Sequence, residues 1–260
     1  MLRLSLTLRR VILLAAIGVL LTACSMTGGD DSDTILAASP ATEASTTAAP
    51  ITIMPIGGSS TQGATGWKTY RCFLDAMLED AGVDFDFVGT QTEPEGGEPY
   101  GCPNEFDQDY EGFWGAHIQH LVDDVTASVE ALQPDVALIH IGPNDIGADQ
   151  EPVSVAEELE SFVTGLQAVS PDITVFVAQI IQCNMPLPKC TENVPAFNDA
   201  IASFASLSTG DSSVIVVDMA TGYNPDHYRD AVHPDEAGEE FIADRWMTAL
   251  RESGTISSSG

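Results

Sequence analysis

Five short apolar runs, separated by amphipathic stretches, constrain the fold more than any other feature of this sequence. The runs are rich in Val and Ile, are bounded by turn residues, and cover residues 51–56, 83–88, 136–141, 173–178 and 214–217. Such runs are typical of buried parallel strands. Helical patterns alternate with them, at residues 67–81, 118–132, 154–166, 195–207 and 239–251. The alternation predicts a doubly wound (flavodoxin-like) α/β fold, a three-layer sandwich with a five-stranded parallel sheet.

Two of the helical patterns are especially clear. From Ile118 to Leu132 apolar side chains recur on one helical face, and the pattern stops at Pro134. Ser154 and Glu157 have the spacing of a capping box, which predicts that the next helix begins at Ser154. In open sheets of this type ligands bind beyond the carboxyl ends of the strands, so candidate functional residues should follow the apolar runs directly.

The first 23 residues have the pattern of a secretory signal. Three arginines precede an apolar run from Val11 to Leu21, which is too short for a comfortable membrane span. The run ends at Ala23-Cys24 and resembles a bacterial lipobox, in which the cysteine is lipidated and becomes the new N-terminus. An ordinary signal peptide with a chance cysteine is the alternative, and Arg9-Arg10 leaves a twin-arginine signal open.

These features predict four segments: a signal peptide at 1–23, a lipidated flexible tether at 24–50, one domain at 51–252 and a disordered tail at 253–260. The tether is rich in Ser, Thr, Ala and Gly and has almost nothing large and apolar to bury. We therefore expect an exported lipoprotein, held at the cell surface or in the periplasm only by its N-terminal lipid.

The charge of the chain is extreme. The sequence has 39 acidic and 9 basic residues and a net charge of −30. Removal of the three signal arginines leaves 6 basic residues and a net charge of −33. Nucleic acid and anionic membrane surfaces are therefore poor partners. The acid excess fits either a high-salt habitat or a merely acidic secreted protein, and the sequence leaves both open.

Four cysteines follow Cys24, and in an exported protein an even number favours disulfides. Cys183 and Cys190 bracket a loop with two prolines, so we expect them to pair, which leaves Cys72 for Cys102. Zinc binding is the rival interpretation, but the sequence has neither a CxxC unit nor an accompanying histidine pattern.

Three polar motifs lie where the fold would place a site. Ser59 follows Gly57-Gly58 at the end of the first run, where it could be a nucleophile, and Asn144 follows the third run, where its amide could stabilise an oxyanion. Asp230 precedes His233 by three residues just before the last helix, as a general base and its orienting carboxylate would. Each motif alone is weak, because small residues, asparagines and glycines are common in turns.

The order of these motifs resembles the SGNH (GDSL-like) hydrolase family over essentially residues 51–250. Within that family the chain is similar to carbohydrate esterases of the acetylxylan-esterase type (family three). The similarity is carried by residues 53–57, 66–68, 86–89, 110–115 and 134–136.

The resemblance implies a serine esterase without cofactor or metal. Its catalytic triad would be Ser59, Asp230 and His233, and its oxyanion hole the backbone N–H groups of Ser59 and Gly115 with the Asn144 side chain. The implied substrate is a small acyl ester, most simply an acetyl group on a polysaccharide, hydrolysed through an acyl-serine intermediate.

Two departures from the family pattern bear on specificity. Gly58 replaces the aspartate of Gly-Asp-Ser, and Phe113-Trp114 replaces a His-Ser pair before Gly115. We expect Phe113 and Trp114 to contact substrate and to make the cleft more apolar. A short-chain lipid or aryl esterase is therefore the rival activity, and a catalytically inactive carbohydrate-binding lipoprotein is the alternative of another class.

The remaining histidines have structural interpretations. His117 and His120 share a helix face but lack a third ligand, so a solvated face is expected rather than a metal site. His140 lies within a strand and is expected to be a hydrogen-bonded core residue, whereas His227 is expected in a surface loop.

We predict that Cys24→Ser abolishes membrane retention and leaves the domain folded, because the tether contributes nothing to the core. One acyl chain binds a bilayer only marginally, whereas a mature lipoprotein carries several. Fractionation of cells labelled with radioactive lipid measures this, and labelled mutant protein in the membrane pellet would contradict it.

Overall fold

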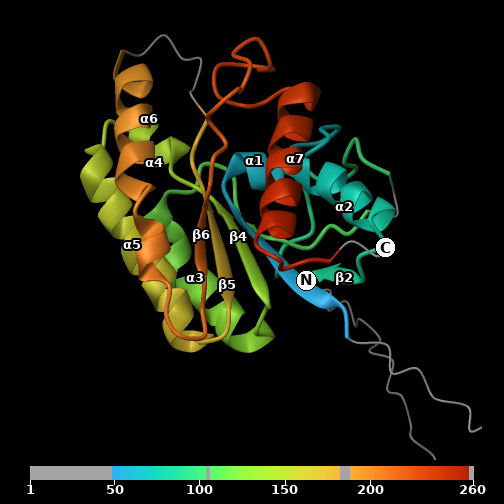
Figure 1. Ribbon diagram of the computed structural model, residues 1–260. Helices are drawn as coiled ribbons and strands as arrows, with labels where there is room; N and C mark the ends of the chain where they lie inside the picture. Colours follow the sequence, from blue (N-terminus) through green and yellow to red (C-terminus); the bar gives the residue numbers. More distant parts are fainter. Residues whose placement is uncertain (1–48, 104–105, 182–187, 258–260) are drawn as a thin grey trace, which may run out of the picture. The chain divides into compact units, whose positions relative to one another are not determined.

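The computed structural model describes residues 49–103, 106–181 and 188–257, and a parallel sheet lies at its centre (Figure 1). Cys24, the expected signal and nearly all of the expected tether lie outside the described residues. Within the described ranges, no helix is both long and apolar enough to span a bilayer.

The sheet has the order β2-β1-β4-β5-β6, which is the order of a flavodoxin-like sheet and confirms the predicted doubly wound fold. Its strands are β1 (Ile51–Gly57), β2 (Phe85–Phe87), β4 (Val136–His140), β5 (Thr174–Ala178) and β6 (Val214–Val217), and every pairing is parallel. A sixth strand, β3 (Glu111–Gly112), pairs with the end of β1 and was not predicted. Two residues are too few to give a periodic signal.

Helices cover both faces of the sheet. They are α1 (Ser59–Gln62), α2 (Tyr70–Asp80), α3 (Ile118–Leu132), α4 (Pro143–Gly147), α5 (Pro152–Val169), α6 (Pro188–Ile201), the 3-10 helix η1 (Phe204–Leu207) and α7 (Glu236–Glu252). In Figure 1, α3, α5 and α6 lie on one face, and α2 and α7 lie on the other. The three-layer sandwich is therefore confirmed.

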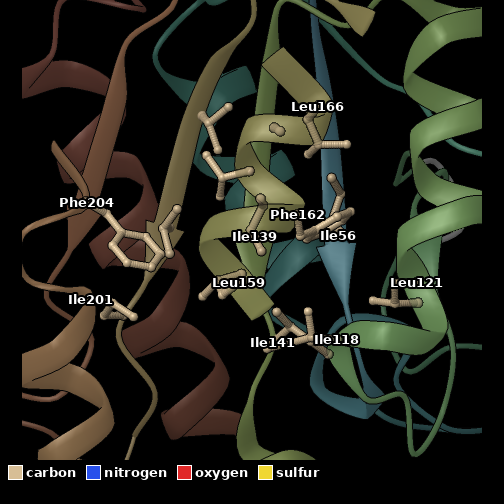
Figure 2. Close-up of a cluster of buried hydrophobic side chains, with 14 of the residues drawn as sticks. Ile56, Ile118, Leu121, Ile139, Ile141, Leu159, Phe162, Leu166, Ile201 and Phe204 are labelled. Carbon is tan, nitrogen blue, oxygen red and sulfur yellow. The ribbon is translucent and has the colours of Figure 1, made fainter. Parts of the chain in front are cut away.

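Alternate residues of each strand enter two separate cores. Ile56 and Ile139 face α3, α5 and α6, where they meet Leu159 and Phe162 (Figure 2). Ile53 and Leu138 face the opposite way and join the core formed with α2 and α7. Period-two alternation on strands covered on both sides explains why these runs are apolar throughout.

Several helix boundaries differ from the prediction: α2 begins at Tyr70 rather than at residue 67, and α7 begins at Glu236 rather than at residue 239. α5 begins at Pro152 with Glu151 as its N-cap, so Ser154 lies inside the first turn and the predicted capping box is wrong. Proline suits the first helical position because its N–H would have no partner there. The helix expected at 195–207 is instead α6, which begins at Pro188, followed by the short helix η1.

The end of β1 is crowded by its neighbours. Gly57 is in register with Gly112 of β3 and with His140 of β4. A Cβ atom on Gly57 would overlap the His140 carbonyl oxygen, and one on Gly112 would overlap Gly57 itself. Glycine at both positions therefore permits three strand ends to meet directly below the turn that carries Ser59.

A disulfide joins Cys72 of α2 to Cys102, as predicted. Both residues pack in a small cluster with Tyr100 and Phe106, which fastens the long loop after β2 to α2. The Cys183–Cys190 pair is not tested, because Cys183 and the side chain of Cys190 lie outside the described residues.

The two described ends of the chain lie together. Ala49 and Ile51, before and at the start of β1, line one shallow hollow with Thr255 and Ile256, which follow α7. This hollow is at the amino ends of the strands, so it lies at the edge opposite the one that carries Ser59.

The first turn of α7 caps α2. Thr69, the N-cap of α2, makes no side-chain capping bond, and the Tyr70 N–H donates instead to Glu239 Oε2 at 2.9 Å. Glu239 is only 1% exposed. Burial raises the pKa of Glu239 to about 8, against the opposing effects of the Tyr70 hydrogen bond and of the Arg229 and Arg71 charges.

We predict that Glu239→Gln stabilises the protein at alkaline pH. The folded-state pKa of Glu239 is raised from 4.5 to about 8. Its contribution to the free energy of unfolding is therefore fully present below pH 4.5 and is lost as the pH rises from there through 8. Glutamine keeps an acceptor for the Tyr70 N–H and does not titrate. Thermal melts from pH 5 to 9 should show a difference from wild type that grows with pH.

The matched control is Glu240→Gln, which changes an exposed neighbour on the same helix. Its melting temperature should follow the wild type at every pH. A Glu239→Gln variant whose melts parallel the wild type over the whole range would contradict the assignment of this titration.

Candidate active site

The strand-to-helix turn after β1 presents Ser59 at the carboxyl edge of the sheet. β1 ends at Gly57, Gly58 is the N-cap of α1, and Ser59 is the first helical residue. Ser59 and Ser60 are half-buried, whereas Thr61 is buried and its Oγ1 lies 3.1 Å from Tyr70 Oη. The turn is thus anchored behind Ser59 while the Ser59 hydroxyl faces the site.

Ser59, His233 and Asp230 form one hydrogen-bonded chain. Ser59 Oγ lies 2.9 Å from His233 Nε2, and His233 Nδ1 lies 2.8 Å from Asp230 Oδ2. The other carboxylate oxygen of Asp230 accepts the backbone N–H groups of Val232 and His233. The loop before α7 therefore holds the carboxylate and the imidazole in fixed relation.

The electrostatics suit an ionised Asp230. Partial burial acts to raise its pKa, but hydrogen bonds from Val232 and His233 outweigh burial and hold the pKa below its ordinary value. A carboxylate on Nδ1 fixes the tautomer in which Nε2 can accept a proton. The arrangement can therefore activate the Ser59 hydroxyl as a nucleophile.

Asn144 lies beside Ser59, on the short helix after β4. Gly142 turns the chain with φ 117°, and α4 begins at Pro143. Asn144 Nδ2 donates to the Ala116 carbonyl at 2.8 Å, which fixes the amide and leaves its second hydrogen free to point elsewhere. A Cβ on Gly58 would lie 3.5 Å from Asn144 Nδ2, so the amide spans from the Ser59 turn to the Gly115-Ala116 turn.

Two backbone donors complete this part of the site. Within the described residues, the N–H groups of Ser59 and Gly115 donate to no protein acceptor. Ser59 is the first residue of its helix, where the N–H has no intrahelical partner, and Gly115 is exposed with φ 73°. Asn144, bonded to the Ala116 carbonyl beside Gly115 and adjoining the Gly58-Ser59 turn, thus links the two turns that carry these expected oxyanion donors.

A cavity of about 290 Å³ adjoins Ser59, Asn144 and His233. Its other described walls are mostly aliphatic and come from the ends of β4 and β5, from α4 and α6, and from the loop before α7: Ile141, Pro143, Ile180, Ile181, Val194 and Val232. An apolar cavity beside the nucleophile can hold the acyl part of an ester.

Indole rings cover the imidazole. The Trp114 ring centroid lies 4.6 Å from that of His233, and the Trp67 centroid lies 5.2 Å from it. Phe113 lies apart from this cluster, because it is 41% exposed and its ring stacks on His120 instead. Of the two residues expected to contact substrate, Trp114 is therefore the one at the site.

Several supporting residues were not found from the sequence. Gln62 Oε1 accepts the Trp114 N–H and so fixes the turn that carries Gly115. Arg71 is fully buried and donates to the carbonyls of Thr61 and Gln62, which ties α1 to α2. The sequence offered one signal for Arg71. A very acidic chain has few arginines, so each arginine in the domain is a candidate for a structural role.

The other histidines differ partly from expectation. His140 is buried, as expected, but neither ring nitrogen has a hydrogen-bond partner in the described structure. The prediction that its ring is hydrogen-bonded is therefore wrong. Burial lowers the pKa of His140 to about 4, so it stays neutral. His117 is half-buried with Nδ1 3.1 Å from Asp145 Oδ1, which corrects the expected solvated face, whereas His120 is exposed.

His227 lies in the loop before α7, as expected, and its Nδ1 is 3.6 Å from Asp235 Oδ2. Among the described residues, no three His, Cys, Asp or Glu side chains are grouped so that they could hold a metal ion.

Comparison with known proteins identifies a family for this chain. Residues 56–241 match the GDSL-like Lipase/Acylhydrolase family. No match was found among curated proteins.

Three solved structures are similar over most of their length. A mutant acetyl esterase crystallised with an acetate ion has a TM-score of 0.69 at 24% identity, covering 80% of this chain and 100% of that one. A carbohydrate esterase family 3 protein from Talaromyces cellulolyticus has the same TM-score, identity and coverage. A family 3 carbohydrate esterase from Clostridium thermocellum has a TM-score of 0.65 at 26% identity, covering 78% of this chain and 96% of that one.

Proposed function

This chain belongs to the GDSL-like lipase/acylhydrolase family and is a carboxylic ester hydrolase, and we propose that Ser59, His233 and Asp230 are its catalytic triad. The observation that carries the proposal is the continuous hydrogen-bonded chain from Ser59 Oγ through His233 to Asp230 beside an apolar cavity. An inactive binding protein of the same fold would have no need to keep this chain intact.

The proposed reaction has two acyl transfers. Ser59 Oγ attacks the ester carbonyl carbon while His233 Nε2 takes the hydroxyl proton, and collapse of the tetrahedral intermediate releases the alcohol, which receives that proton. Water then attacks the acyl-serine with His233 again as base, and the carboxylic acid leaves. Asp230 stabilises the transient imidazolium in both halves.

The oxyanion of each tetrahedral intermediate would be held by the N–H groups of Ser59 and Gly115 and by the Asn144 amide. Asn144 is pre-oriented by its bond to the Ala116 carbonyl, so no reorganisation is needed when charge develops.

We propose acetyl esters of polysaccharides as the substrate class. The support is the similarity to an acetyl esterase and to two family 3 carbohydrate esterases, together with the motifs shared with that group. Indole rings beside His233 offer flat faces on which the apolar side of a sugar ring could rest while its ester reaches Ser59.

A second candidate is a short-chain lipid or aryl esterase. The aliphatic cavity of about 290 Å³ favours it, because an acetyl methyl group alone would leave much of such a cavity empty. Trp114 in place of a small polar residue points the same way.

We also propose that the protein acts outside the cytoplasm, anchored by lipid on Cys24. The support is the signal-like N-terminus, the lipobox-like sequence before Cys24 and the disulfide between Cys72 and Cys102.

We predict graded effects within the site when p-nitrophenyl acetate hydrolysis is measured. Ser59→Ala should remove turnover almost completely, and His233→Ala should be nearly as severe and add little to Ser59→Ala, because these residues act as a unit. Asn144→Ala should lower kcat by about 10² to 10³-fold with little change in KM, since its amide acts on transition-state charge. Ser60→Ala, the adjacent hydroxyl, is the control and should be mild. An active Ser59→Ala enzyme would refute the assignment of the nucleophile.

We predict that acyl length separates the two candidate activities. p-Nitrophenyl acetate, butyrate and octanoate should be compared with acetylated xylan at matched enzyme concentration. A carbohydrate acetyl esterase should release acetate from acetylated xylan and lose kcat/KM from p-nitrophenyl acetate to butyrate and again to octanoate. A maximum at butyrate or beyond, with no acetate released from xylan, would favour the lipid or aryl esterase instead.

A further inference from the structure

Arg229 holds the loop that carries the catalytic histidine at two points. Its backbone N–H donates to the His233 carbonyl at 2.9 Å, and its side-chain Nε donates to the Pro234 carbonyl at 2.6 Å. The residue lies directly before Asp230, so these bonds close the segment from Asp230 to Pro234 into a short ring. The backbone on both sides of the imidazole is fixed by one arginine.

The same guanidinium fixes the aromatic cover of the imidazole. Its carbon lies 4.1 Å from the centroid of the Trp67 ring, in the geometry of a cation–π contact. Trp67 presents its ring to His233 at 5.2 Å and touches Trp114 at 5.5 Å, and Trp114 in turn lies 4.6 Å from His233. The imidazole is therefore packed against two indoles, one of which rests on Arg229.

The position of Arg229 is not explained by an ion pair. Within the described residues its Nη2 atom is buried and has no hydrogen-bond acceptor, and its charge interacts with buried Glu239 without a direct contact between them. A buried donor left without a partner has an energetic cost. In a chain with few basic residues, a guanidinium kept at that cost is more readily explained by what it positions than by stability.

We propose that Arg229 is a positioning residue for His233, which holds the imidazole in line with Ser59 both through the loop backbone and through Trp67. The inference rests on the proposed triad. If His233 is displaced by a fraction of an ångström, the enzyme still binds substrate beside the cavity, but the imidazole accepts the Ser59 proton less well. The effect should therefore fall on kcat and on the reactivity of Ser59 rather than on KM.

The test compares Arg229→Ala and Arg229→Lys with Arg245→Ala. Arg245 is a matched control, because its guanidinium also stacks on a ring, that of Phe241 at 4.8 Å, and donates to a carbonyl, that of Thr221, outside the described site. Each variant is assayed for kcat and KM with p-nitrophenyl acetate, for the rate of Ser59 labelling by a fluorophosphonate, and for its melting temperature.

Arg229→Ala should lower kcat and the labelling rate by about 10- to 100-fold with KM within about threefold of wild type. Arg229→Lys restores the positive charge without the planar stack or the Nε donor, so it should recover melting temperature but not kcat. Arg245→Ala should keep wild-type kcat. The inference is overturned if kcat of Arg229→Ala stays within about threefold of wild type, or if lysine restores kcat and melting temperature in parallel.

A double variant tests whether Arg229 acts through Trp67. Trp67→Ala alone should lower kcat, and adding Arg229→Ala should cost less than the product of the two single effects, since part of the same support is already lost. If the double variant loses kcat by the full product of the two single losses, that part of the inference is overturned. A wild-type protein that neither turns over p-nitrophenyl acetate nor reacts with the fluorophosphonate would instead refute the proposed function itself.

Discussion

The meeting of three strand ends at Gly57 is the constraint on which the rest of the structure depends. β1 pairs there with β3 on one side and β4 on the other, at a separation that leaves no room for a side chain at Gly57 or Gly112. Because the three strands are parallel, the turns that follow them leave the same edge. The Ser59 turn, the Gly115 turn and the Asn144 helix are therefore brought together by backbone register before any side chain interacts. The bond from Asn144 to the Ala116 carbonyl then fastens two of these turns to each other.

Two arginines near the site of this acidic chain contact carbonyls and aromatic faces rather than carboxylates. Arg71 donates to backbone carbonyls and to Tyr100 Oη and lies 4.3 Å over the Tyr110 ring, and Arg229 repeats the pattern with Pro234 and Trp67. Contacts of this kind do not depend on the ionisation of a partner. The scaffold around the site should thus be less sensitive to acid and salt than one built from ion pairs.

Much of the fold follows from local sequence, and the exceptions have physical causes. The strand at 214–217 and the helix at 118–132 are found as predicted, because their apolar periodicity is strong and their ends carry turn signals. β3 escaped because it consists of two residues that depend on β1 for a partner. The site motifs were readable because two of them directly follow a strand and the third lies just before the last helix, whereas Arg229 and Trp67 act through tertiary stacking between segments more than 150 residues apart. No spacing rule reports such a contact.

The pairing of the described ends in one hollow has a practical meaning for handling the protein. Ala49 and Ile256 lie near each other at the amino edge of the sheet, while Ser59 and its neighbours open at the carboxyl edge. Anything fused before Ala49 or after Ser257, whether an affinity tag, a second module or a solid support, would project from the back of the molecule. Substrate as bulky as a polymer could then still approach the front unhindered, and joining the two ends would offer a route to circularly permuted forms.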